Sequence, residues 1–157
     1  MDKDIIIEQF TSKHIEGALD ILQEYDQFHH ASDPKHFKNM DKEEEFNYLK
    51  WILEEDGSYG IVATKDNKVV GFAIFGLLLK PSNFASPEVT YISEMVVKDG
   101  FRSRGIGEKM LKRIIEFSKT RGIDKIELEI TNANERGIGF YRRTGFYDYS
   151  KVMFLDI

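Results

Sequence analysis

The first sixty residues alternate between apolar and charged stretches, a pattern that predicts one strand and two helices. Consecutive isoleucines within residues 4–9 are typical of a short strand. From Ile15 to Tyr25, large apolar residues recur every three or four positions, which predicts a helix capped by Thr11 or Ser12. A second helix is expected over residues 41–55, because a glutamate three residues after the opening aspartate completes a capping box.

The middle of the chain has the pattern of a hairpin, a further strand and a long helix. Residues 59–65 and 68–79 are apolar runs separated by Asp66-Asn67, which suits a two-residue hairpin turn. A loop with proline and serine follows, and the next apolar run, residues 89–98, is expected to be a strand. Apolar residues at helical spacing then predict a helix over residues 107–121.

Three further elements complete the expected fold. Residues 124–131 alternate as a strand, residues 134–143 form a short helix that Gly145 can end, and residues 146–155 close the chain as one or two strands. With no repeat or linker, the sequence predicts a single domain over residues 1–157. Its class is α/β, a mixed (α+β) sheet flanked by helices, with parallel strands on either side of the long helix.

The composition is that of an ordinary globular protein and narrows the chemistry. The 157 residues are 41% hydrophobic and 31% charged, and they include no cysteine. Disulfides, thiolate nucleophiles and cysteine–zinc sites are thereby excluded. The sequence starts without the pattern of a signal peptide, and the longest apolar run, residues 69–79, is too short to cross a bilayer. A cytoplasmic location without a membrane partner is expected.

The charge is unevenly distributed along the chain. Residues 1–57 contain 15 acidic and six basic side chains, whereas residues 58–157 contain 12 acidic and 16 basic ones. This split favours a cationic ligand for the N-terminal half and an anionic ligand for the C-terminal half, although solvated acidic helix faces would give the same counts. Nucleic acid is not expected as a partner, because no broad basic surface is indicated.

A glycine-rich loop, residues 102–107, leads directly into the long helix. The free N–H groups at a helix N-terminus bind anions without any special side chain. Gly105 and Gly107 permit positive φ and let a phosphate approach the backbone, and Arg102 and Arg104 can add charge-assisted hydrogen bonds. The loop therefore predicts a phosphate-binding site, although an ordinary loop-to-helix connection has similar glycines.

Two common phosphate motifs fit this loop poorly. A P-loop needs a lysine and a hydroxyl residue where Ile106 and Gly107 stand. A dinucleotide-binding fingerprint needs a third glycine where Met110 stands. Because Glu127 lies near the position of a ribose-binding acid, a nucleotide-binding α/β protein stays open as an alternative.

Two motifs and the order of the elements point to one family. The first motif is Arg102-x-x-Gly105-x-Gly107 after a strand that ends Met95-Val96-Val97. The second is Asn134-x-x-Gly137-x-x-Phe140-Tyr141-x-x-x-Gly145-Phe146, in which Gly137 replaces the commoner alanine. Together they resemble motifs A and B of the Gcn5-related N-acetyltransferase (GNAT) superfamily, and the resemblance covers nearly the whole chain.

The resemblance implies a site for acetyl-CoA as co-substrate. The strand before the loop splays from its parallel neighbour, and its backbone pairs with the pantetheine arm. The loop covers the pyrophosphate, Asn134 hydrogen-bonds the arm, and Tyr141 stands beside the thioester sulfur. The cofactor-binding residues that it implies are Met95, Val96, Val97, Arg102, Ser103, Arg104, Gly105, Ile106, Gly107, Asn134 and Tyr141.

The resemblance also implies the reaction, transfer of an acetyl group to a primary amine within a ternary complex. An amine has a pKa of about 10 and must lose a proton before it attacks. Glu94 is the candidate base, acting through water, and Tyr141 is the candidate acid. Many relatives with a glutamate base carry it one residue earlier, where this chain has Ser93, so Glu94 as a structural or acceptor-binding carboxylate stays open.

The expected acceptor is a small-molecule or peptide amine, walled by the first two helices as in relatives. The acidic N-terminal half favours a polyamine, an aminoglycoside, an amino acid or a lysine side chain. The segment with His29, His30, Asp33 and His36 could line the acceptor site or form a local cluster, and no metal is expected there. A homodimer is possible, as in many relatives. The rival function is an acetyl-CoA-binding sensor without turnover.

Overall fold

The computed structural model describes residues 4–157, and a mixed five-stranded sheet forms its centre. The strands lie side by side in chain order: β1 (Ile6–Gln9), β2 (Ser58–Lys65), β3 (Lys68–Leu79), β4 (Glu88–Val97) and β5 (Ile126–Leu128). The helices are α1 (Ile15–Ser32), which follows a 3-10 turn over Ser12–His14, α2 (Lys42–Glu54), α3 (Ile106–Thr120) and α4 (Glu135–Arg143). Neighbouring strands are antiparallel except β4 and β5, which are parallel, so the predicted mixed α/β fold is confirmed. None of these described helices is long and apolar enough to cross a membrane.

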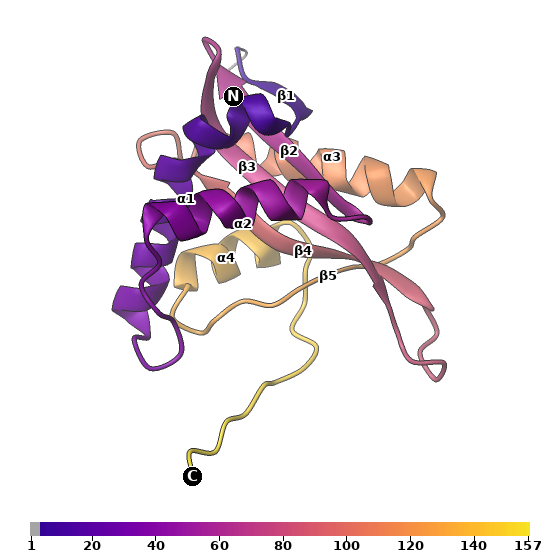
Figure 1. Cartoon of the computed structure of the whole chain (residues 1–157). Coiled ribbons are helices and arrows are strands. Elements are labelled where there is room, and N and C mark those ends of the chain that lie inside the picture. The colour runs from indigo at the N-terminus through magenta and orange to yellow at the C-terminus, as the bar shows by residue number, and fades with distance from the viewer. Residues whose placement is uncertain (1–3) are drawn as a thin grey trace.

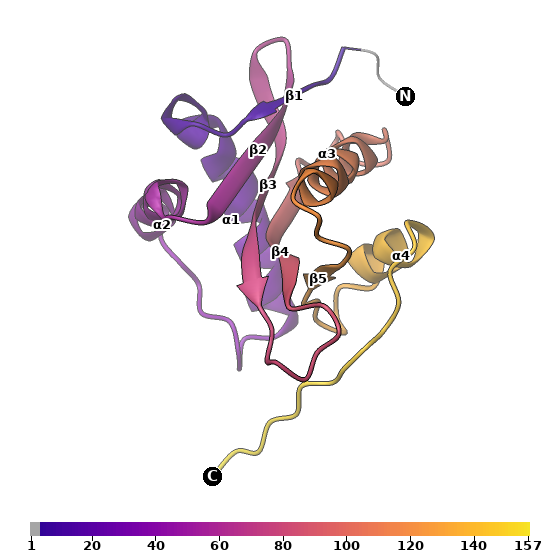
Figure 2. The same cartoon turned by 90° about the vertical axis from the view of Figure 1, so that its right-hand side faces the viewer.

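The helices cover both faces of the sheet. Helices α1 and α2 lie on one face, and α3 and α4 lie on the other (Figures 1 and 2). Phe72 of β3 packs with Leu19 and Leu49 under the first pair, whereas Phe75 packs with Ile114 of α3. Because both faces are covered, β3 is an unbroken apolar run rather than an alternating one.

Local signals in the sequence gave the element boundaries. Asp41 caps α2 by accepting a hydrogen bond from the Glu44 N–H at 2.9 Å, and the Glu44 carboxylate accepts one from the Asp41 N–H at 3.0 Å. Asp66 and Asn67 take φ values of 49° and 60°, which is the hairpin turn expected between β2 and β3. Gly145 follows α4 with φ of 102°.

The expectation of strands over residues 146–155 is wrong. This segment has no regular secondary structure. Phe146 packs partly buried against the core, but the later large apolar side chains are exposed, with 88% for Met153 and 87% for Leu155. A strand needs a neighbour for its N–H and C=O groups, and β5 extends over only Ile126–Leu128 rather than the predicted residues 124–131. The segment instead leaves the sheet (Figure 1), and the Phe154 ring lies 4.6 Å from that of His36.

Candidate active site

The two parallel strands, β4 and β5, separate after a short paired stretch at one edge of the sheet. β4 and β5 are paired only over Thr90–Ile92 and Ile126–Leu128, whereas β4 runs on to Val97. On its other edge β4 stays paired with β3, with Met95 opposite Ala73. From residue 93 onward, the edge of β4 that faces β5 therefore has no strand partner within residues 4–157. Such an edge offers its N–H and C=O groups to an extended ligand.

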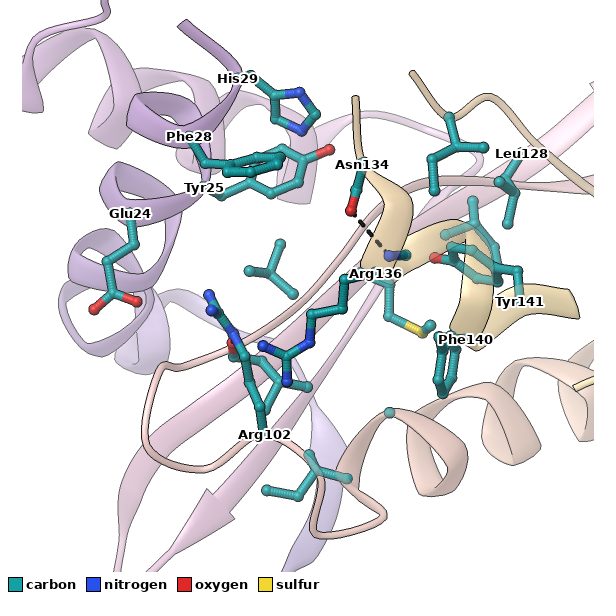
Figure 3. A pocket seen from close by; sticks show the side chains of 18 of the residues that line it. Glu24, Tyr25, Phe28, His29, Arg102, Leu128, Asn134, Arg136, Phe140 and Tyr141 are labelled. Carbon is teal, nitrogen blue, oxygen red and sulfur yellow. Dashed lines mark hydrogen bonds between the residues drawn. The ribbon is translucent and has the colours of Figure 1, made fainter. Parts of the chain in front are cut away.

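A groove of about 990 Å³ occupies this gap. Figure 3 shows α1 along one side, with Tyr25, Phe28 and His29, and α4 along the other. The backbone segment 95–97 of β4 and the loop before α3 complete the lining. The volume is at the upper end of the range of about 300–1,000 Å³ found for small-molecule sites.

The loop places the start of α3 at one end of the groove. Gly105 is the residue before the helix and has φ of 78°, a left-handed conformation that favours glycine. The first intrahelical bond runs from the Lys109 N–H to the Gly105 carbonyl, so the N–H groups of residues 106–108 have no acceptor within the helix. Ile106 and Gly107 line the groove, so a positive helix end meets any ligand there.

Gly107 is needed for a different reason from the one predicted. It is not among the residues with positive φ in the described chain, so that expectation is wrong. A Cβ atom at this position would lie 3.2 Å from the ring of Phe140 on α4. Gly107 therefore lets α4 approach the start of α3 closely.

The two arginines of the loop take different positions. The Arg102 Nε donates to the Val97 carbonyl at 2.9 Å, and its Nη1 lies 3.3 Å from the Asp99 carboxylate, so this side chain braces the loop against the end of β4. The Arg104 guanidinium lies over the Phe101 ring at 5.2 Å, and among the described residues it does not line the groove, although Ser103 does.

The sequence reasoning missed Arg136, which projects into the groove beside Arg102 (Figure 3). It lies in the first turn of α4, where a positive side chain opposes the helix dipole. That unfavourable placement is the signal that could have identified it as an anion-binding residue.

Asn134 caps α4 from within the groove wall. Its Oδ1 accepts a hydrogen bond from the Gly137 N–H at 2.9 Å, which leaves the amide nitrogen as the group for a ligand. A Cβ atom at residue 137 would lie 2.8 Å from that nitrogen and from the Ile130 side chain. Glycine here therefore provides space for the cap.

Tyr141 stands on the same helix and lines the groove. Its ring packs edge-on against Phe140 and Phe146, with 5.2 Å between centroids in each pair. Burial raises the pKa of the phenol to about 12, so the hydroxyl keeps its proton throughout the neutral range.

Glu94 lies on the face of β4 that packs against α1 and α2, opposite to the face that packs against α3. The pairing with β3 shifts by one residue, so that Ile92 opposes Phe75 and Glu94 opposes Ile74, with Ser93 as the additional residue. Ser93 is exposed and lines the groove. Because of this bulge, Ser93 faces the groove, whereas Glu94 faces α1 and α2.

The Glu94 carboxyl is buried and only partly satisfied. Tyr48 of α2 donates its hydroxyl hydrogen to Oε1 at 2.5 Å, whereas Oε2 is buried and has no hydrogen-bond partner within residues 4–157. Burial raises the pKa of Glu94 to about 7; the Tyr48 hydrogen bond opposes this change, and the negative charge of Asp26 adds to it.

Tyr25 connects Glu94 to the groove. It lines the groove from α1, and burial followed by the charges of Glu94 and Tyr141 raises its pKa. Tyr25 therefore lies close enough to interact electrostatically with both Glu94 and Tyr141. Sequence reasoning missed Tyr25 and Tyr48, because tyrosines at helical spacing are usually core residues. The available signal was that a buried phenol requires a hydrogen-bond partner.

The sequence as a whole identifies the family. It matches the Acetyltransferase (GNAT) family over residues 19–146. The chain belongs to this family. An uncharacterized N-acetyltransferase of Methanocaldococcus jannaschii is 31% identical over 149 residues, which cover 94% of this chain and 65% of that protein. Another from Archaeoglobus fulgidus is 34% identical over 60% of this chain and 64% of its own length. The GNAT chain thus spans less than two thirds of either relative.

Solved structures share the GNAT fold of this chain. A Bacillus halodurans protein superimposes with a TM-score of 0.89 at 21% identity, covering 97% of this chain and 99% of that one. An aminoglycoside 6′-N-acetyltransferase of Acinetobacter haemolyticus does so with a TM-score of 0.78 at 12% identity, covering 97% of each chain. At these identities the likeness concerns the fold alone.

The histidine segment of this GNAT protein forms local contacts. His29 is buried against the rings of Tyr25 and Phe37, at 4.3 and 4.9 Å, and burial lowers its pKa. The His30 Nδ1 lies 2.7 Å from the Phe37 carbonyl, and that of His36 lies 2.8 Å from the Asp33 carboxylate. Within residues 4–157, no three His, Cys, Asp or Glu side chains are grouped to bind one metal ion.

Proposed function

We propose that this GNAT protein transfers the acetyl group of acetyl-CoA to a primary amine of a small cationic acceptor. The main support for this proposal is that a single groove contains both the N-terminus of α3, with its free N–H groups, and the buried phenol of Tyr141. The family uses acetyl-CoA, and that molecule combines a pyrophosphate with an extended arm. Both parts have counterparts in this groove.

The residues of the groove fit the molecule in the order of its parts. The N–H groups of residues 106–108 and the Arg136 guanidinium bind the pyrophosphate. The unpaired edge of β4 over residues 95–97 hydrogen-bonds the arm as an added strand would. The Asn134 amide nitrogen donates to the same arm, which brings the sulfur to Tyr141.

Two side chains, Glu94 and Tyr141, then accept and donate the protons of the reaction. Bound acetyl-CoA supplies an acyl group that its thioester has already activated. Glu94 accepts one proton of the cationic amine through water, and the nitrogen lone pair that this frees then forms a bond to the acyl carbon. A backbone N–H of β4 that points away from β3, such as that of Met95, stabilises the negative charge on the acyl oxygen. As the carbon–sulfur bond breaks, the Tyr141 hydroxyl gives its proton to the sulfur. The phenolate then accepts the second proton, which the nitrogen loses as the amide forms.

The acceptor follows from the charges beside the groove. Glu94, Asp26 and Glu45 are carboxyls of the layer between the sheet and the first two helices, and within residues 4–157 no positive charge influences the pKa of Glu94. A cationic amine supplies the missing charge. The relatives from Methanocaldococcus jannaschii and Archaeoglobus fulgidus are both named N-acetyltransferases, which is consistent with nitrogen as the acceptor atom.

A thiol-release assay with acetyl-CoA tests the proposal against polyamines, aminoglycosides, amino acids and lysine peptides. We expect turnover with a cationic member of the panel and a KM for it that rises with ionic strength. Calorimetry with acetyl-CoA, CoA and NAD runs in parallel. Tight acetyl-CoA binding without turnover on any amine would support a sensor, and binding of NAD alone would support a nucleotide-binding protein.

A further inference from the structure

A side chain outside the groove holds the candidate base. Tyr48 lies on α2, and its hydroxyl is 2.5 Å from the Glu94 Oε1 across the layer between α2 and β4. The neighbouring Leu49 is fully buried in the hydrophobic cluster beneath α2, which fixes the height of this turn above the sheet. The phenol therefore approaches Glu94 from a rigid support.

The hydrogen bond leaves one oxygen of Glu94 for chemistry. A carboxylate at a bulge can rotate about its side-chain torsions, and a charge-assisted hydrogen bond to one oxygen restricts that rotation. Oε1 is engaged by Tyr48, whereas Oε2 has no partner among the described residues and is buried. A buried unpaired oxygen is costly unless a ligand or water uses it.

We propose that Tyr48 is a positioning residue that holds Glu94 through Oε1 and presents Oε2 to the water that relays the proton of the acceptor amine. This inference rests on the proposed function, in which Glu94 is the base. It gives α2 a part in the reaction, although no residue of α2 lines the groove among those described.

The groups around Glu94 set the direction of the test. Tyr25 and Asp26 face it from α1, Tyr48 from α2 and Tyr91 from its own strand. The Tyr48 hydrogen bond lowers the pKa of Glu94, and the charge of Asp26 raises it. Removing only the hydroxyl must therefore raise the pKa of Glu94 and delay its ionisation as the pH increases.

The experiment compares the pH profiles of kcat/KM for the wild type and Tyr48→Phe. We expect the acidic limb to move upward by about one to two pH units, since a hydrogen bond to a charged group has that magnitude. The KM for acetyl-CoA should stay unchanged. The matched control is Tyr59→Phe, because Tyr59 packs against Phe75 and Phe117 on the α3 side of the sheet, and it should leave the limb in place.

Two further variants separate the possible failures. Glu94→Gln should abolish the acidic limb, and adding Tyr48→Phe to it should then have no further effect on the rate. If Glu94→Gln keeps the limb, the proposed base is wrong. If it abolishes the limb while Tyr48→Phe lowers kcat/KM equally at every pH, the base stands and Tyr48 is merely structural. Circular dichroism and acetyl-CoA binding confirm that each variant is folded.

Discussion

Replacing Tyr141 by phenylalanine isolates the proton that the proposed mechanism gives to the leaving sulfur. The ring contacts with Phe140 and Phe146 do not involve the hydroxyl, so the groove wall keeps its shape. Because burial holds the pKa of the phenol at about 12, the wild type carries this proton at every pH of a normal assay. The substitution therefore removes a donor without changing the charge of the resting site.

The expected loss follows from the donor's role. A hydrogen bond to a developing thiolate contributes about 1.5–3 kcal/mol, and proton transfer adds to it, so kcat should fall roughly 10- to 1,000-fold. Thiol release measures kcat, and calorimetry should show an unchanged Kd for acetyl-CoA. Tyr147→Phe, which removes an exposed phenol, serves as the control. An unaltered kcat for the Tyr141 variant would remove Tyr141 from the mechanism.

Three other predictions concern particular backbone and buried positions. Gly105→Ala and Gly100→Ala both force alanine into positive φ and should each lower the free energy of unfolding by roughly 1 kcal/mol. Only Gly105→Ala should weaken acetyl-CoA binding measured by calorimetry. Equal losses of binding in both variants would refute the assignment of the loop before α3 as the phosphate site. Gly137→Ala should lower Tm because its Cβ would lie too close to Asn134 and Ile130, whereas Gly139→Ala should raise Tm through the higher helix propensity of alanine. A higher Tm for Gly137→Ala would show that the Asn134 cap can shift to make room. Burial raises the pKa of Glu45 from 4.5 to about 7. The unfolded chain therefore loses this proton at lower pH than the folded chain, and the free energy of unfolding falls by at most roughly 3 kcal/mol as the pH rises from 4.5 to about 7. Glu45→Gln should reduce the difference in unfolding free energy between pH 5 and pH 8 measured in urea, and an undiminished difference would assign it to other groups.

The features that were predicted correctly depend only on residues that are adjacent in the sequence. The capping box of α2 and the turn at Asp66-Asn67 require only a few consecutive side chains. The loop before α3 is similar, since its capacity for anions belongs to backbone groups that any helix start exposes. The strand pattern of residues 146–155 failed, because alternation describes what a strand could bury and does not supply a neighbouring strand.

The acceptor side could not be predicted in the same way, because its parts come from distant positions. Tyr48 and Glu94 are 46 residues apart and meet only because the β4 bulge sets the register opposite Ile74 and Phe75. Moving the register by one residue would exchange the surroundings of Ser93 and Glu94. The family resemblance suggested the glutamate one position earlier, so the bulge, rather than the residue type alone, decides which side chain meets α2. In the proposed function the amine is deprotonated by Glu94, so substitutions in the layer between α1, α2 and β4 should change acceptor preference while leaving acetyl-CoA binding intact.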